Sequence, residues 1–180
     1  MDMQLKPQDI VIALKMITTG DIRWTYVQFS YELYISASEI NAGVKRLAQS
    51  NLVIINHEGN NSQPKVVRNA LIEFLVHGVQ YAFPPVRGEL TRGMPTAYAA
   101  PPLSKRIVQP KEPPPVWPDK DSKVRGYSFA PLYKTVPQAA RKDQELYELL
   151  ALVDAVRDGR AREKSMAEKA LTKRILTNEG

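Results

Sequence analysis

The chain has 180 residues, a net charge of +6 and no cysteine, and 43% of its residues are hydrophobic. This apolar content is enough to build a core, and the absence of cysteine excludes disulfides, cysteine-based zinc sites and thiol catalysis. No run approaches the roughly eighteen apolar residues of a membrane span, and the N-terminus lacks a basic-then-apolar signal, so we expect a cytoplasmic protein without membrane contact.

The positive charge is unevenly distributed along the chain. Residues 1–80 hold seven Lys/Arg and seven Asp/Glu, residues 81–126 hold eight and four, and residues 127–180 hold ten and eight. A net positive charge suits a polyanionic partner. Because the first region is neutral by count, a nucleic-acid contact there must depend on the local arrangement of its cations.

Two helices are predicted first. Pro7 is favoured at a first helical position, and apolar residues recur at helical spacing over residues 7–18. Gly20 lies in the turn that ends this helix. The second helix begins near residue 24, ends at residue 33 and can be capped by Thr25. Its core-facing residues are expected to be Trp24, Val27, Tyr31 and Leu33.

A third helix is predicted over residues 37–50, after a tight turn. The Ser36 hydroxyl can accept a hydrogen bond from a free amide of the first turn, and Glu39 completes a capping box. Apolar residues at helical spacing give this helix one buried stripe. The stripe consists of Ile40, Val44 and Leu47, and the opposite face carries Ser38, Asn41, Lys45, Arg46 and Gln49.

A β-hairpin follows the third helix. Residues 52–55 are rich in β-branched side chains, residues 57–65 form a polar loop, and residues 66–67 resume the apolar pattern. Three helices and a hairpin resemble a winged helix-turn-helix of the MarR-like kind, over residues 5–78. The resemblance implies that Ser36, Ser38, Asn41 and Lys45 contact base edges, and that Arg46, Gln49, Asn60, Asn61 and Lys65 hold phosphates.

The next region is dense in proline. A helix over residues 70–77 and a short strand over residues 79–83 lead into residues 84–127, where proline excludes long helices and favours extended backbone. Apolar residues such as Trp117 indicate an ordered arm that lies across its own domain or a partner subunit. Within it, two Arg-Gly units over residues 87–96 suit either a phosphate contact or a turn-rich loop with solvated arginines.

The C-terminal region is predicted to be mainly helical. A strand over residues 124–129 precedes helices over residues 138–155 and 160–176, with a break at Gly159. The alternating charges are typical of a solvated face, and Asp154 and Asp158 are interpreted as a solvated pair. The apolar face of the first helix is predicted to form a dimer interface. It consists of Leu146, Leu149, Leu150 and Val153. An alternative role for this region is a second nucleic-acid contact through Arg157, Arg160 and Arg162.

These patterns predict an α+β fold, mainly α, with a winged helix-turn-helix domain (1–83), a proline-rich extended arm (84–127) and a C-terminal helical region for dimerisation or partner binding (128–180). The predicted function is a sequence-specific transcriptional regulator, a repressor, that binds double-stranded DNA as a homodimer. The alternative is a protein-interaction module, such as an antitoxin-like partner of an enzyme. The sequence has no catalytic motif, metal-ligand set or phosphate cradle, so we expect no enzyme activity, cofactor or metal.

Overall fold

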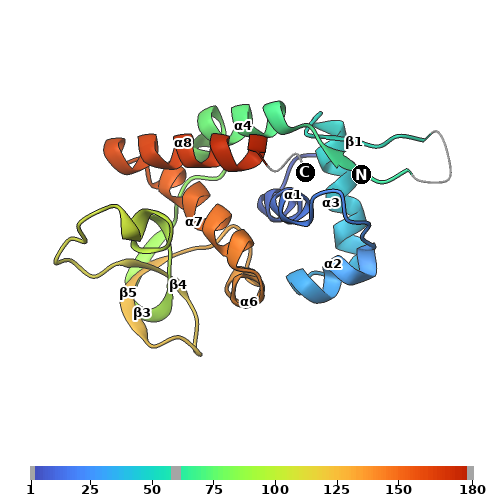
Figure 1. Ribbon diagram of the computed structural model, residues 1–180. Coiled ribbons are helices and arrows are strands. Elements are labelled where there is room, and N and C mark those ends of the chain that lie inside the picture. The colour runs from blue at the N-terminus through green and yellow to red at the C-terminus, as the bar shows by residue number, and fades with distance from the viewer. Residues whose placement is uncertain (1–2, 58–61, 178–180) are drawn as a thin grey trace.

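The computed structural model describes residues 3–57 and 62–177. The fold is α+β and mainly α. Helices and a short hairpin form one end of the molecule, a small sheet forms the other, and further helices join the two (Figure 1). Within the described ranges, no helix is long and apolar enough to cross a membrane.

The first end consists of helices α1 (Pro7–Thr19), α2 (Tyr26–Leu33) and α3 (Ala37–Gln49), followed by the hairpin strands β1 (Val53–Ile54) and β2 (Lys65–Val66). The two strands pair antiparallel. The predicted order of three helices and a hairpin is confirmed, and the bounds of α3 agree with the predicted helix to within one residue.

Local hydrogen bonds explain where α2 and α3 begin. The Thr25 hydroxyl accepts from the amide three residues on at 3.0 Å, and the Ser36 hydroxyl accepts from the Glu39 amide at 3.3 Å. Both caps satisfy amides that the first helical turn leaves without partners. The Glu39 carboxylate was expected to complete the capping box, but it accepts from Arg46 instead.

The predicted core face of α2 is partly wrong. Trp24 and Leu33 are buried as expected, whereas Val27 and Tyr31 are 57% and 74% exposed. Phe29 takes the core position, with its ring stacked on Trp24 at 3.9 Å between centroids. Helix α2 begins only at Tyr26, and Phe29 and Leu33, four residues apart, share its inner face. Val27 and Tyr31 lie two residues before them and therefore face outward.

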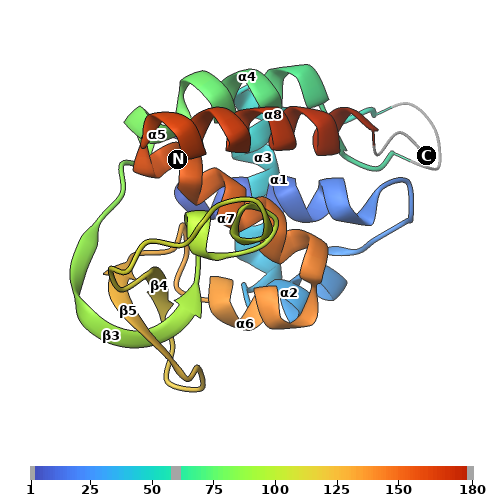
Figure 2. The same ribbon diagram turned by 60° about the vertical axis from the view of Figure 1, so that its left-hand side comes forward.

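Helix α4 (Arg68–His77) starts before the predicted residue 70 and is followed directly by α5 (Val79–Ala82). A strand was expected over residues 79–83, and this prediction is wrong because the backbone bonds from residues 82 and 83 return to Gly78 and Val79, as in a helical turn. Helix α4 lies along the last helix of the chain in both ribbon views (Figures 1 and 2).

A sheet replaces the predicted arm. Strands β3 (Arg87–Pro95), β4 (Pro115–Pro118) and β5 (Val124–Phe129) close on one another, with β3 antiparallel to both others and β4 parallel to β5. Residues 84–127 hold no α-helix, as expected, but they include two 3-10 helices, Ala97–Ala99 and Leu103–Lys105, between β3 and β4. The region also folds on itself, the predicted turn-rich loop over residues 87–96 is mostly strand, and the predicted boundary at residue 127 falls inside β5.

Two glycines allow the three strands to approach so closely. A Cβ atom at Gly93 would lie 2.1 Å from the Trp117 carbonyl oxygen, and one at Gly126 would lie 2.1 Å from the Pro114 carbonyl oxygen. Glycine is required where another backbone comes this near. The two glycines therefore fix which face of β3 and of β5 points inward.

The C-terminal region forms α6 (Val136–Lys142), α7 (Gln144–Asp158) and α8 (Ala161–Thr177). The predicted long helix is broken at Asp143, whose carboxylate caps α7 through the Leu146 amide at 3.0 Å. Helix α7 ends at Gly159, which adopts a φ of 75° that suits glycine, so the predicted break is confirmed.

Helix α7 is the centre of the molecule. Except for the half-buried Glu148, residues 146–157 are buried, packed against α1, α8 and the connections of the sheet. The apolar face from Leu146 to Val153 was expected to form a dimer interface. That assignment is wrong for this conformation, because the same face is already covered by the chain's own helices.

Candidate nucleic-acid interface

The outer face of α3 carries a row of hydrogen-bonding side chains. Ser36, Ser38, Lys45 and Gln49 are exposed and Asn41 is half-buried. Residues that form the inner stripe of α3 are fully buried, so the helix can turn only this polar face toward a partner. The face offers hydroxyl, amide and ammonium groups, which are the donors and acceptors that recognise base edges in a major groove.

Arg46 does not belong to this face, and its prediction as a phosphate contact is corrected. The residue is 5% exposed, and its side chain binds the fully buried Asp9 of α1 through two hydrogen bonds, Nε to Oδ2 at 2.8 Å and Nη2 to Oδ1 at 2.7 Å. It also donates to Glu39. Charge-assisted, two-pronged bonds of this kind are strong, and they hold α3 against α1.

Gly43 makes this buried pair possible. A Cβ atom at Gly43 would lie 2.5 Å from Ile12 and 2.9 Å from the Asp9 carboxylate. The glycine therefore lets α1 and α3 cross closely enough for Arg46 to reach Asp9. A glycine in the middle of an otherwise helical pattern is the one sequence signal that could have placed Arg46 toward α1.

The hairpin lies beside the connection between α1 and α2. Lys65 on β2 is exposed, while Asn60 and Asn61 lie outside the described residues. The side-chain amide nitrogen Nε2 of Gln63 donates to the Trp24 carbonyl oxygen at 3.3 Å. This bond joins the returning arm of the hairpin to the base of α2 and helps to set its position relative to α3.

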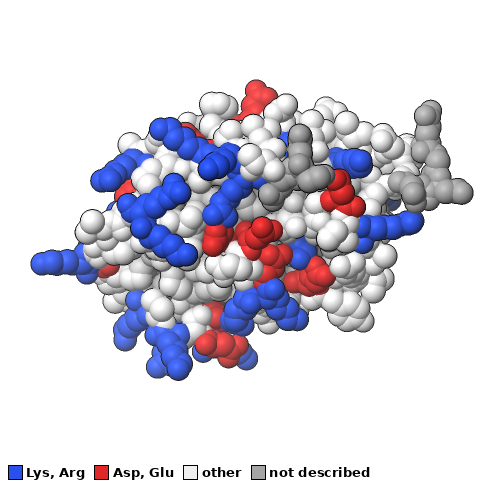
Figure 3. All heavy atoms as spheres, viewed as in Figure 1, with Lys and Arg blue, Asp and Glu red and all other residues white. Residues whose placement is uncertain are grey.

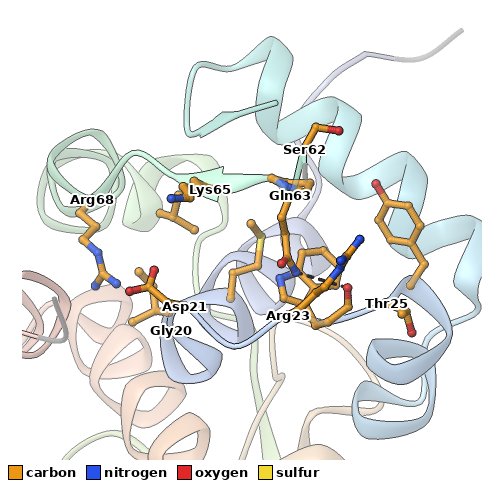
Figure 4. A pocket seen from close by; sticks show the side chains of 14 residues that line it. Gly20, Asp21, Arg23, Thr25, Ser62, Gln63, Lys65 and Arg68 are labelled. Atoms are coloured by element: carbon orange, nitrogen blue, oxygen red, sulfur yellow. Dashed lines mark hydrogen bonds between the residues drawn. The ribbon is translucent and has the colours of Figure 1, made fainter. Parts of the chain in front are cut away.

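A groove of about 740 Å³ separates the hairpin from that connection. Asp21 and Arg68 lie at one end, Arg23 and Thr25 lie at the other, and Gln63 stands between them (Figure 4). Trp24 contributes to the apolar part of its wall, together with Met16 and Ile17 from the end of α1. The groove is open, and its polar groups do not converge on one point, so it suggests no particular ligand.

The charge around α3 is balanced. Glu39 is paired with Arg46, and Lys15 of α1 binds Glu32 and Asp143 at 2.7 and 2.8 Å. In the part of the chain that the structure describes, Lys45 makes no ion pair, and neither does Lys65 on the hairpin. In Figure 3, Lys and Arg gather toward the end that holds the sheet, and acidic residues mix with them toward the α2–α3 end.

The arginines proposed as a second nucleic-acid contact separate in the structure. Arg157 is buried on Asp154, with Nη1 to Oδ1 at 2.7 Å, so both its predicted role and the predicted solvated state of Asp154 are wrong. Arg160 lies over the ring of Tyr98, 5.3 Å from its centroid. Arg160 also pairs with Asp158, so among these three arginines only Arg162 is exposed and makes no ion pair with a described residue.

Asp154 is the acceptor of a network that sequence reasoning missed. Its Oδ2 accepts from Thr96 at 2.7 Å and from the Trp117 indole at 2.6 Å, and Arg157 extends the network to the Phe83 carbonyl oxygen at 2.8 Å. The network ties α7 to the sheet and to the segment that enters it. Every donor has an acceptor, so it serves packing and not ligand binding.

Comparison with protein-family models, with curated proteins and with solved structures found no match to this chain. The candidate interface therefore depends on the geometry of its own residues. In the described ranges, no group of three or more His, Asp or Glu is placed to hold a metal ion.

Proposed function

We propose that the chain is a MarR-like winged helix-turn-helix regulator, a repressor that binds double-stranded DNA. The observation that carries the proposal is the exposed polar face of α3 beside the hairpin. In this family the third helix enters the major groove and the hairpin, or wing, lies along the backbone. In our proposal α3 is the recognition helix.

Base contacts come from the middle of α3. Asn41 can bind adenine through two hydrogen bonds and Lys45 can donate to guanine, while Ser36 and Ser38 contact base edges nearby and Gln49 contacts a phosphate. Lys65 on the wing supplies a phosphate contact. Because Arg46 is committed to Asp9, it has no direct role and acts by holding α3 in position.

The experiment begins with selection of bound fragments from a pool of random duplexes, followed by binding measurements on the enriched sequence. Replacing Asn41 or Lys45 by Ala should weaken binding to that sequence by about 5- to 150-fold, which corresponds to about 1–3 kcal/mol per two-pronged base contact. The matched control is Lys169→Ala, because Lys169 is an exposed lysine on the distant α8. Failure to enrich any sequence, or equal binding by all three variants, would count against the proposal.

The proposed regulator acts as a homodimer, because two copies contact two half-sites. Since α7 is buried, the dimer needs another surface, and the exposed Val27 and Tyr31 on α2 supply an apolar pair one helical turn apart. Light scattering on the double variant Val27→Ser/Tyr31→Ser should show a smaller mass than the unaltered protein at the same concentration. An unchanged mass would exclude this face as the dimer contact.

The same observation favours a second candidate function, which is binding of a different protein. An exposed apolar pair beside a neutral helical unit suits a protein partner as well as a second copy. In this case duplex DNA of any sequence should bind weakly. Purification of the chain with its natural partner, followed by loss of that partner in the α2 double variant, would support the second function over the first.

A further inference from the structure

The outer face of the β3–β5 strand pair combines charge with apolar surface. In the register of this pair, Leu90 lies opposite Tyr127 and Arg92 lies opposite Arg125. Side chains two residues apart on one strand share a face, so all four point the same way. Leu90 and Tyr127 are 43% and 48% exposed, and both arginines are exposed.

The two arginines are an unusual feature of this face. Like charges directly opposite each other in an antiparallel pair destabilise it. Among the described residues, no carboxylate forms an ion pair with Arg92 or with Arg125. The pair therefore costs stability within the chain, and an anionic partner would remove that cost.

The fold forces the pair outward. Gly93 and Gly126 occupy the inner face, where the carbonyl oxygens of Trp117 and Pro114 leave no room for a Cβ atom. Arg92 and Arg125, the residues just before these glycines, lie on the opposite face of the strand pair, side by side and exposed. Residues 81–126, which hold most of the sheet, carry eight Lys/Arg against four Asp/Glu, so the surroundings of the pair are also cationic.

We infer that the face formed by Leu90, Arg92, Arg125 and Tyr127 binds a single strand of nucleic acid. The two guanidinium groups hold phosphates, and an unpaired base stacks on the ring of Tyr127 against Leu90. This surface is separate from α3 and lies at the opposite end of the molecule from the hairpin (Figures 1 and 2).

A single strand fits this face better than a duplex does. Phosphates alone would satisfy the arginines, but they leave the exposed ring and the leucine beside it uncovered. Unpaired bases present a π-face that stacks on aromatic side chains, whereas bases in a duplex are already stacked on one another. The combination of cations and an aromatic ring on one strand pair is the arrangement that single-strand binders use.

The test measures binding of labelled oligothymidylate and oligouridylate at low salt, with a duplex of arbitrary sequence as a third ligand. The double variant Arg92→Gln/Arg125→Gln should lower affinity for both single strands by about tenfold or more and flatten the salt dependence. Tyr127→Ala should lower it by about fivefold or more, and Tyr127→Phe should keep it, because stacking needs only the ring. The ratio of the two oligonucleotide affinities shows whether DNA or RNA is preferred.

The matched control is Lys169→Gln/Lys173→Gln, which removes the same charge from the exposed side of α8. Equal loss in this control and in the arginine variant would overturn the inference, as would full affinity in Tyr127→Ala. Tighter binding of the duplex than of either single strand, or binding of polyglutamate in place of both, would overturn it as well. Asn41→Ala and Lys45→Ala should leave single-strand affinity unchanged, so failure of the α3 proposal and failure of this inference are distinguishable.

Discussion

The two ends of the molecule present nucleic-acid chemistry in different ways. The α3 face is polar and nearly neutral, because Glu39 binds Arg46, and Glu32 and Asp143 bind Lys15, so that Lys45 is its one cation without a described ion pair. The β3–β5 face is strongly cationic and carries an exposed aromatic ring. A neutral polar face depends on directional hydrogen bonds and so suits sequence discrimination, whereas a cationic face with a ring suits sequence-tolerant binding.

Each surface is attached to the helical core through a buried carboxylate, Asp9 for α3 and Asp154 for the sheet. Arg46 binds Asp9 and thereby joins α3 to α1 only. Asp154 receives Arg157, Trp117 and Thr96, and so it joins α7 to two separate segments of the sheet region. The second attachment has more donors and spans more of the chain, which predicts that it matters more for stability.

The largest effect is therefore expected for Asp154→Ala. The change leaves the Arg157 guanidinium buried without a counter-charge and removes the acceptor of Trp117 and Thr96. Loss of one partner of a buried pair costs about 3–5 kcal/mol, and each buried donor left without an acceptor adds about 1–3 kcal/mol. Urea unfolding should show a loss of about 5 kcal/mol or more, and hydrogen exchange should accelerate first in β3 and β4.

Asp121→Ala is the control for that measurement. Asp121 is an exposed acid in the loop before β5, and its nearest cation, Arg141, is 3.9 Å away. A surface pair of this kind contributes under about 1 kcal/mol. If Asp154→Ala and Asp121→Ala lower the free energy of unfolding equally, the network does not hold the sheet on α7.

Arg46→Ala should have the next largest effect. It leaves the fully buried Asp9 without its counter-charge, which costs about 3–5 kcal/mol of unfolding free energy. Duplex binding should fall as well, because α3 loses its bond to α1, while oligothymidylate binding should persist at low temperature. Lys45→Ala, with an exposed side chain on the same helix, should leave stability nearly unchanged. Equal stability of the two variants would contradict the structural role of Arg46.

The elements that could be predicted are those whose cause is local. Ser36, Ile40 and Val44 lie within a few residues of one another, so the cap and the spacing of α3 are visible in the sequence. The same holds for the strand that became β5 and for the end of α7 at Gly159.

The features that could not be predicted depend on partners far apart in the chain. Asp9 and Arg46 are separated by 37 residues, and Thr96 and Asp154 by 58. Periodicity placed Arg46 and Asp154 on charged faces because it takes no account of what packs against a helix. The pairing of Arg92 with Arg125 likewise requires the register of two strands, and only the strand glycines hinted at a close backbone approach.

A smaller effect is expected where Asp143 joins α1 to α7. Burial alone would raise the pKa of Asp143, but hydrogen bonds from Lys15 and the Leu146 amide outweigh it and lower that pKa in the folded protein. A carboxylate with a lowered folded pKa contributes stability above its unfolded pKa, about 4, and loses it as pH falls through the folded value. Asp143→Asn should therefore lower the unfolding free energy by about 1.5–3 kcal/mol at neutral pH.

The difference between Asp143→Asn and the unaltered protein should shrink steadily as the pH is lowered below about 4. Glu32, the other carboxylate on Lys15, has a pKa lowered in the same sense, so the unaltered protein should lose stability in the same window. Urea unfolding at a series of pH values checks both statements. A difference that stays constant with pH would show that Asp143 acts through its shape in the α7 cap and not through its charge.

The smallest effect is expected for Lys65→Ala, and it bears most directly on the difference between the two ends. Lys65 is exposed on β2, so its loss should leave stability unchanged and should weaken binding to all duplexes equally. Because one phosphate contact changes the slope of log affinity against log salt by about 0.9 for duplex DNA, the slope should become shallower by about that amount per protomer. Oligothymidylate binding should keep its slope, since Lys65 lies at the other end of the molecule from Arg92 and Arg125. A changed slope for the oligonucleotide, or a changed sequence preference for the duplex, would mean that the two surfaces do not act separately.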